Sequence, residues 1–296
     1  MNRFAIHIAT KNRRDELLLT LAKVASLPGD VECVVIDDGS TDGTFEAIKT
    51  AFPKVSIRRN AIPKGYIWCR NTMLNETLAD YAISLDDDAN FVTENPLPAI
   101  EAHFESHPKC GLVAFRIFWG KVLPGNTAHT ESETRVKAFV GCGHVWRISA
   151  WRAIADYPEW FGFYGEEQFA SLQLFHRHFE IDYLPQVLVH HRVDMQARKA
   201  DTAGVKARFR NALRADWYNY FLFYPIPSAV GKTASSVKNQ FVKVFKGNPQ
   251  LALPLFGAVW DLIRHTPQIL RQRNPLTKEA YRQYMKLPQA KIFWKA

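Results

Sequence analysis

The chain has 296 residues, of which 47% are hydrophobic and 23% charged, and its net charge is +9. This composition excludes an intrinsically disordered or fibrous protein and provides for a sizeable hydrophobic core. The charge is uneven, because residues 1–196 carry 20 Lys/Arg against 25 Asp/Glu, whereas residues 197–296 carry 18 against 4. The two parts therefore face different partners, and the basic part suits an anionic surface or nucleic acid.

Neither a secretory signal nor a membrane-spanning helix is predicted. The first apolar stretch is short and runs into charged residues, and no run of about 18 apolar residues occurs. The four cysteines are scattered and form no C-x-x-C pair, which argues against a zinc site and a disulfide framework. Free thiols fit a reducing compartment, so we expect a cytoplasmic protein, with peripheral attachment to the inner face of the cell membrane left open by the basic part.

The first ninety residues alternate between strand patterns and helix patterns. The expected strands cover residues 4–9, 32–36, 55–58 and a segment that ends at Asp86, and the expected helices cover residues 15–25, a segment capped by Ser40 or Thr41 that ends near Ala51, and residues 68–77. This order predicts an open parallel sheet with helices on both faces. Ligands bind such sheets at the carboxyl ends of the strands, so Thr10, Asp37-Asp38 and Asp86 to Asp88 should converge on one cleft.

The pattern changes after residue 95. The expected elements are a helix at 97–105, a strand at 110–119, strand and loop at 136–148, a helix that starts at 151–155 and a strand at 183–189. From about residue 205 the chain is expected to be helical, aromatic and basic.

Three consecutive carboxylates, Asp86, Asp87 and Asp88, follow the fourth expected strand. Alternate residues of a strand face the same side, so Asp86 and Asp88 can converge while Asp87 points elsewhere. Hard divalent cations prefer such oxygen ligands, and one or two carboxylates together with substrate phosphates commonly hold Mg²⁺ or Mn²⁺. The alternative interpretation is a solvated acidic turn.

Three further motifs are candidates for chemistry. In VVIDDGSTDGT, a carboxylate behind a buried strand could accept a hydrogen bond from a base N–H, although an ordinary capped turn would look the same. Glu166 and Glu167 stand at an expected helix start, where the helix dipole favours a charged base, and the alternative is ordinary N-terminal helix charge. His190 and His191 follow the last expected strand, and a structural role is their alternative.

Taken in order, these motifs resemble those of family 2 glycosyltransferases, whose catalytic domain has a GT-A fold. The matching stretches cover roughly the first two thirds of the chain and are IATKNR, VVIDDGSTDGT, GYIWCRN, SLDDDAN, GEEQFA and LPQVLVHHR. The resemblance implies a GT-A catalytic domain over residues 1–204, with a nucleotide-sugar half at about 1–95 and an acceptor half at about 96–204. A basic, aromatic helical extension would follow over residues 205–296.

The resemblance also implies roles for the nucleotide-sugar side. Thr10 and Asp38 would contact the nucleotide, with Asp38 bonded to the base. Arg70 would lie near the base and the diphosphate. Asp86 or Asp87 would contact the ribose.

On the reacting side, Asp88 would bind a divalent metal, Mn²⁺ or Mg²⁺, together with His191 or, as a close second, His190. Glu167 matches the acid that serves as catalytic base, with Glu166 as the alternative. The loop that lines the sugar and acceptor cleft would contain Gly141 and Gly143.

The sequence thus predicts a metal-dependent, inverting glycosyltransferase that uses a UDP- or dTDP-sugar. The metal and Arg70 would stabilise the diphosphate leaving group, and a carboxylate would take the proton of the acceptor hydroxyl. Two alternatives stay open: a nucleotidyl- or phosphoryl-transfer enzyme that uses the acidic cluster, and a non-catalytic protein that binds membrane surfaces.

The extension combines Lys and Arg with many aromatic residues, which fits an anionic bilayer surface or single-stranded nucleic acid. No nucleic-acid fold signature occurs, so no nucleic-acid partner is expected. A helical extension that packs on the catalytic domain is the third interpretation. Arg208-Phe209-Arg210-Asn211 resembles a stretch of bacterial family members that build surface polysaccharide, which implies a glycan or lipid-linked acceptor.

Overall fold

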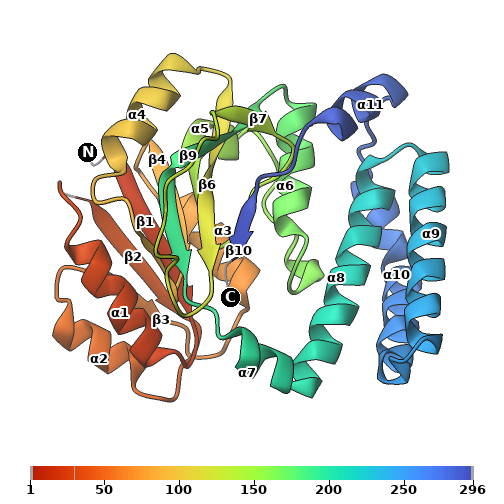
Figure 1. Ribbon diagram of the computed structural model, residues 1–296, viewed down its shortest axis with the longest axis horizontal. Helices are drawn as coiled ribbons and strands as arrows, with labels where there is room; N and C mark the ends of the chain where they lie inside the picture. Colours follow the sequence, from red (N-terminus) through yellow and green to blue (C-terminus); the bar gives the residue numbers. More distant parts are fainter. Residues whose placement is uncertain (1–2, 30, 295–296) are drawn as a thin grey trace.

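The computed structural model describes residues 3–29 and 31–294. Its first part alternates strands and helices as predicted (Figure 1). The elements are β1 (Phe4–Thr10), α1 (Arg14–Ala25), β2 (Glu32–Asp37), α2 (Thr44–Ala51), β3 (Ser56–Arg59), α3 (Tyr66–Glu76) and β4 (Tyr81–Asp86). Strands β3, β2, β1 and β4 lie side by side and pair in parallel, which confirms the predicted arrangement.

The register brings three polar strand ends together. Thr10 pairs with Asp37 of β2, and Ala9 pairs with Asp86 of β4. The interior of these strands is almost entirely buried, as expected for apolar runs in a sheet covered on both faces. Buried strands with polar ends therefore build the floor of a site.

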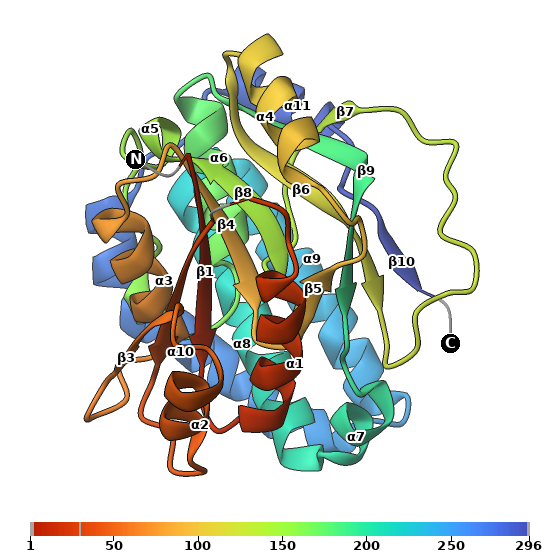
Figure 2. The same ribbon diagram turned by 90° about the vertical axis from the view of Figure 1, so that its left-hand side faces the viewer.

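The second part of the sheet is mixed. Its elements are β5 (Ala89–Phe91), α4 (Leu97–Ser106), β6 (Cys110–Trp119), β7 (Thr134–Val136), β8 (Gly143–Arg147), α5 (Ile148–Trp151), the 3₁₀ helix η1 (Glu159–Phe161), α6 (Glu166–His176) and β9 (Glu180–His191). Strand β8 runs antiparallel to both β4 and β6, while β6 and β9 are parallel. In Figure 2, α1 and α2 lie in front of the sheet and α6 lies behind it, so helices cover both faces.

Two local predictions were wrong. Helix α2 is preceded by Gly43 instead of Ser40 or Thr41, and the Asp42 side chain accepts a hydrogen bond from the Thr44 backbone at 3.1 Å. The helix expected to start at 151–155 instead ends at Trp151, because the following backbone bonds span only three residues and Gln173 bonds both polar backbone groups of Ala155.

The C-terminal part is helical, as predicted. It contains α7 (Met195–Ala200), α8 (Thr202–Phe223), α9 (Ile226–Phe245), the 3₁₀ helix η2 (Pro249–Leu251), α10 (Ala252–Gln272), α11 (Lys278–Lys286) and the short strand β10 (Ile292–Trp294). Figures 1 and 2 show α8, α9 and α10 as a layer beside α6. Among the described residues, no helix is both long enough and apolar enough to cross a membrane.

The extension shares a hydrophobic core with the rest of the chain. Tyr218 and Phe223 of α8 belong to the same buried cluster as Trp146 of β8 and Phe169 of α6. Strand β10, which the sequence did not predict, pairs in parallel with the end of β6. The extension therefore packs on the sheet, while the division of the chain at residue 204 stays a prediction.

Candidate active site

The carboxyl ends of β1, β2 and β4 open into a cavity of about 1150 Å³. Its lining includes most of the residues that the sequence singled out: Thr10, Asp38, Asp86, Asp87, Asp88, Gly141, Glu166, Glu167 and His191. The predicted convergence of Thr10, Asp38 and Asp86 to Asp88 on one cleft is confirmed. Asp37, expected there as well, is instead fully buried and accepts a hydrogen bond from the Ser40 backbone N–H at 2.8 Å. Arg70, Gly143 and His190 do not belong to this lining.

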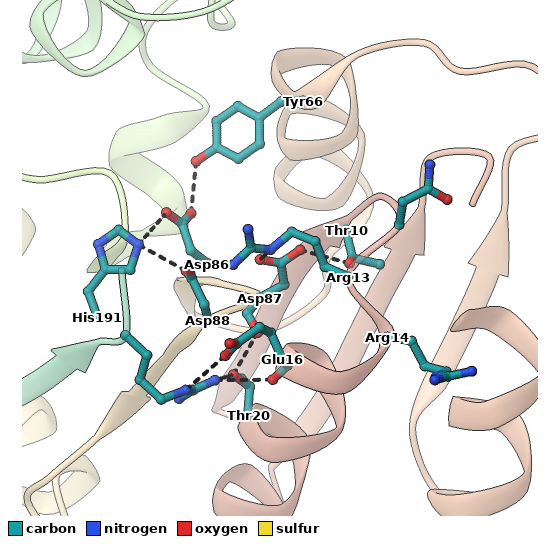
Figure 3. A network of polar contacts seen from close by, with 12 residues as sticks. Thr10, Arg13, Arg14, Glu16, Thr20, Tyr66, Asp86, Asp87, Asp88 and His191 are labelled. Atoms are coloured by element: carbon teal, nitrogen blue, oxygen red, sulfur yellow. Dashed lines mark hydrogen bonds and ion pairs between the residues drawn. The ribbon is translucent and has the colours of Figure 1, made fainter. Parts of the chain in front are cut away.

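The three consecutive carboxylates divide as predicted, although β4 ends at Asp86 and Asp87 and Asp88 form a turn. His191 Nε2 lies 2.9 Å from Asp88 Oδ1 and 3.8 Å from Asp86 Oδ2 (Figure 3). Asp87 points to the other side, where its Oδ2 accepts a hydrogen bond of 2.8 Å from Thr10 Oγ1. Thr10, expected at the nucleotide, thus holds a carboxylate of the site in place.

Cations within the chain offset the repulsion among these carboxylates. Arg13 lies between Asp87 and Asp88 and pairs with both, with Arg13 Nε 2.8 Å from Asp87 Oδ1 (Figure 3). Arg70 pairs with Asp86 at 2.7 Å. Burial raises the pKa of Asp87 to about 7 although Arg13 opposes this, whereas for Asp88 burial is outweighed by His191 and Arg13, which hold its pKa below the usual value.

Asp86, Asp88 and His191 can hold a divalent cation. Each offers one ligand atom, and these atoms all lie within 4.8 Å of one another. Two carboxylate oxygens and an imidazole nitrogen suit Mn²⁺ and, with water and phosphate ligands added, Mg²⁺. The second candidate, His190, is turned away, since its Nε2 lies 2.7 Å from the Gly120 carbonyl oxygen.

The groups around His191 favour its protonated form. Burial alone would lower its pKa, but Cys142 and Asp88 beside the ring raise the pKa to about 11. A metal ligand must be a neutral imidazole, so an incoming cation would displace this proton.

Glu166 and Glu167 begin helix α6 and line the cavity. Glu166 is buried, and its Oε2 has no hydrogen-bond partner among the described residues. Burial raises the pKa of both carboxyls, and the neighbouring Glu167 raises that of Glu166 further. The helix dipole was expected to favour the charged form, but the effect of burial on the pKa is larger. A raised pKa suits a group that accepts a proton near neutral pH.

Gly141 makes room for the Glu167 carboxylate. A Cβ at position 141 would lie 2.3 Å from Glu167 Oε1, closer than any real contact. Gly143 has a different role, because it is buried in β8, where an added Cβ would meet Val189 and Ile117. Of the two glycines predicted in the acceptor loop, only Gly141 therefore lies at the cavity.

Asp38 is held by the loop before α3. Its carboxylate accepts hydrogen bonds from the backbone N–H groups of Lys64 at 2.7 Å and Gly65 at 2.9 Å, and from Asn60 Nδ2 at 2.8 Å. Burial opposes ionisation, but these bonds hold the pKa of Asp38 below its usual value. The side chain borders the cavity, and its contact with a base stays a prediction.

Arg70 contacts Asp86 and does not itself line the cavity. Its guanidinium is buried over the ring of Tyr66 at 4.6 Å, and the Tyr66 hydroxyl donates to Asp86 Oδ1 at 3.1 Å. No role was assigned to Tyr66 or Arg13 from the sequence, although both stand inside the quoted motifs GYIWCRN and IATKNR. Their roles depend on which side of a helix start faces the strand ends, and the sequence pattern does not show this.

The sequence and the structure were compared with those of known proteins. A model of glycosyl transferase family 2 matches residues 5–156. A search of the curated proteins found no match. Many solved structures are similar in fold.

Three of these structures illustrate the likeness. TarS 1–349 of S. aureus in complex with UDP is 16% identical with a TM-score of 0.57, and the match covers 74% of this chain and 65% of that chain. GalNAc-T7 with UDP, GalNAc and Mn²⁺ is 15% identical with a TM-score of 0.60, covering 75% of this chain and 48% of that one. The mannosyltransferase PcManGT of Pyrobaculum calidifontis, in complex with GDP-Man and Mn²⁺, is 14% identical with a TM-score of 0.55, covering 96% and 78%.

The central sheet flanked by helices and the likeness to these structures show that the chain has the GT-A fold. The chain matches less than two thirds of the length of the TarS and GalNAc-T7 structures. Because the family model matches more than half of the chain, the protein belongs to glycosyl transferase family 2.

Proposed function

We propose that the protein transfers a sugar from a nucleotide-diphosphate sugar, UDP- or dTDP-linked, to a hydroxyl group of a glycan or lipid-linked acceptor in cell-surface polysaccharide or glycolipid synthesis. One observation carries this proposal. A single cavity contains both a metal-type donor set, Asp86, Asp88 and His191, and a pair of neighbouring carboxyls with raised pKa, Glu166 and Glu167.

The donor side would be organised by the strand ends. Asp86, Asp88 and His191 would hold Mn²⁺ or Mg²⁺, which supplies positive charge for the departing diphosphate. Asp38, directly after β2, would accept a hydrogen bond from the base of the nucleotide. The ribose contact is assigned to Asp86 or Asp87, and Asp86 is the more exposed of the two, with 25% of its side chain accessible against 11%.

The acceptor side would be organised by α6. Glu167, placed beside Gly141, would accept the proton of the attacking hydroxyl, with Glu166 as the alternative base. A single base gives one displacement at the anomeric carbon, so the product would have inverted configuration.

The first experiment is thermal unfolding with UDP, dTDP and GDP, each with and without Mn²⁺. We expect a metal-dependent rise of the melting temperature with one or more of these nucleotides. No metal-dependent shift with any nucleotide would contradict the proposal.

A screen of nucleotide sugars then separates the alternative chemistry. Glycosyl transfer or donor hydrolysis releases a nucleoside diphosphate, whereas nucleotidyl transfer breaks the diphosphate and releases or transfers a nucleoside monophosphate. Only the first product agrees with the proposed sugar transfer.

A further inference from the structure

Helix α10 carries an apolar face that no described residue covers. Its exposed large side chains recur at intervals of three, four, three and seven residues: Leu253, Phe256, Trp260, Ile263 and Leu270. Leu253 is 83% accessible and Trp260 61%. This spacing places the side chains on one side of the helix, which in most amphipathic helices is buried. Here these side chains are exposed to solvent.

The opposite side of α10 is anchored, so this exposure is not that of a loosely attached helix. Leu255, Ala258 and Ile269 are buried. Asp261 accepts two hydrogen bonds from Arg210 of α8, at 2.7 and 2.6 Å. The orientation of α10 about its own axis is therefore set by packing, and the apolar residues are left outward by the fold.

Helix α9 extends the same surface. Val230, Val242 and Phe245 are exposed, and Phe245 is 83% accessible. Phe241 lies between the two helices, with its ring 6.4 Å from that of Phe245 and 6.0 Å from that of Phe256. We call this continuous apolar surface of residues 226–272 the α9–α10 face.

The exposed charged residues of segment 226–272 have one sign. Residues 226–272 contain five exposed basic residues, Lys238, Lys243, Lys246, Arg264 and Arg271, and a sixth, Lys232, which lines a second cavity together with Asp216 of α8. Their single carboxylate is Asp261, which is buried and neutralised by Arg210. The exposed charged residues of this segment are therefore all cations.

This combination discriminates between possible occupants. A symmetric contact with a second copy of the chain would bring the same cations together, with no exposed carboxylate in this segment to offset them. An anionic bilayer instead offers hydrocarbon to the apolar side chains and negative headgroups to the lysines and arginines.

We propose that the α9–α10 face docks on the surface of an anionic lipid bilayer. Phe245, Leu253, Phe256 and Trp260 enter the headgroup boundary, and the surrounding cations contact the phosphates. This inference depends on the exposed face and its charge, and it holds whether or not the proposed sugar transfer is correct.

The test is flotation of the full chain with vesicles, with no nucleotide present. We expect the chain to float with phosphatidylcholine vesicles that contain about 30% phosphatidylglycerol, and to float far less with pure phosphatidylcholine, because the cations need anionic lipid. Phe256→Glu/Trp260→Glu should weaken binding at least about tenfold, since charges would enter the apolar boundary. Arg264→Gln/Arg271→Gln should weaken it about 25-fold, because each cation near an anionic surface contributes a factor of about five.

A matched control is Leu19→Glu/Leu78→Glu, which changes two exposed apolar residues outside this face and should bind vesicles as the unaltered chain does. Melting temperatures show that each variant folds. Failure of the unaltered chain to float with anionic vesicles overturns the proposal, as does equal flotation of Phe256→Glu/Trp260→Glu. A dimer in lipid-free solution that Phe256→Glu/Trp260→Glu dissociates, without any vesicle binding, assigns the face to a second copy instead.

Discussion

Substitution of Gly141 by alanine tests whether the position of Glu167 matters. The backbone of Gly141 does not require glycine, because its φ is not positive, so the new methyl group is the only change. The added Cβ would lie 2.3 Å from Glu167 Oε1, and ordinary contacts begin at 3.4 Å. The carboxylate must therefore move by about 1 Å, a displacement that costs about 100-fold in rate, or ~2.7 kcal/mol, when the displaced group takes part in the reaction.

The assay compares turnover with nucleotide binding. We expect Gly141→Ala to lose about 100-fold in turnover of the donor found in the screen, while its affinity for the nucleotide and Mn²⁺ stays unchanged. Gly125→Ala is the matched control, because a Cβ there meets nothing within 4 Å and its φ is not positive. Normal turnover by Gly141→Ala would refute the reasoning, since Glu167 could then move without consequence.

Three further substitutions test other parts of the structure. Asp88→Asn removes a carboxylate from the metal-type donor set and should weaken metal-dependent nucleotide binding at least about tenfold, measured by calorimetry. Glu167→Gln should leave nucleotide binding unchanged and reduce turnover by about 100- to 10,000-fold. Asp261→Asn should reduce the free energy of unfolding in urea by about 2 kcal/mol at pH 7, because Arg210 loses a charged partner. Burial opposes the ionisation of Asp261, but Arg210 holds its pKa below the usual value, so this stabilisation is complete above about pH 4 and is lost as the pH falls through the lowered pKa.

Each of these predictions has a control or an outcome that would contradict it. Asp15→Asn, an exposed carboxylate outside the cavity, should change neither metal-dependent binding nor stability appreciably. If Glu166→Gln loses turnover and Glu167→Gln does not, the base is Glu166. A difference between Asp261→Asn and the unaltered chain that persists undiminished at pH 2 would contradict the assigned pH dependence.

The predictable part of the fold is the part that local patterns determine. Apolar runs that end in polar residues located β1, β2 and β4, and the strand–helix alternation implied their parallel pairing. Strand β10 has only three residues, and its partner β6 lies far away in the sequence. No local pattern identifies such a strand, because its pairing with β6 depends on the path that the chain takes after α11.

The site was predictable in its residue types and less so in its geometry. Three carboxylates and two histidines indicated a metal, but choosing between His190 and His191 requires the register. Ala89 pairs with His191, and this pairing brings that ring beside Asp88. No role could be assigned to Arg13 from the sequence. Its ion pairs with Asp87 and Asp88 depend on the position of the start of α1 relative to the end of β4, which the sequence pattern does not give.

The return of the chain to β6 has a mechanical consequence. The extension leaves the sheet after β9 and is attached again by β10, by the Lys137 N–H bonded to the Pro288 carbonyl at 2.8 Å, and by Lys291 paired with Glu131 at 2.8 Å. The contacts around β10 are individually weak. They form readily because the chain connection after β9 already holds the extension close to the sheet, which keeps the effective concentration of the contacting groups high. A force that acts on α9 and α10 therefore reaches the sheet through the core that α8 shares with α6 and, in addition, at the ends of β9 and β6, which contribute His191 and Trp119 to the wall of the cavity.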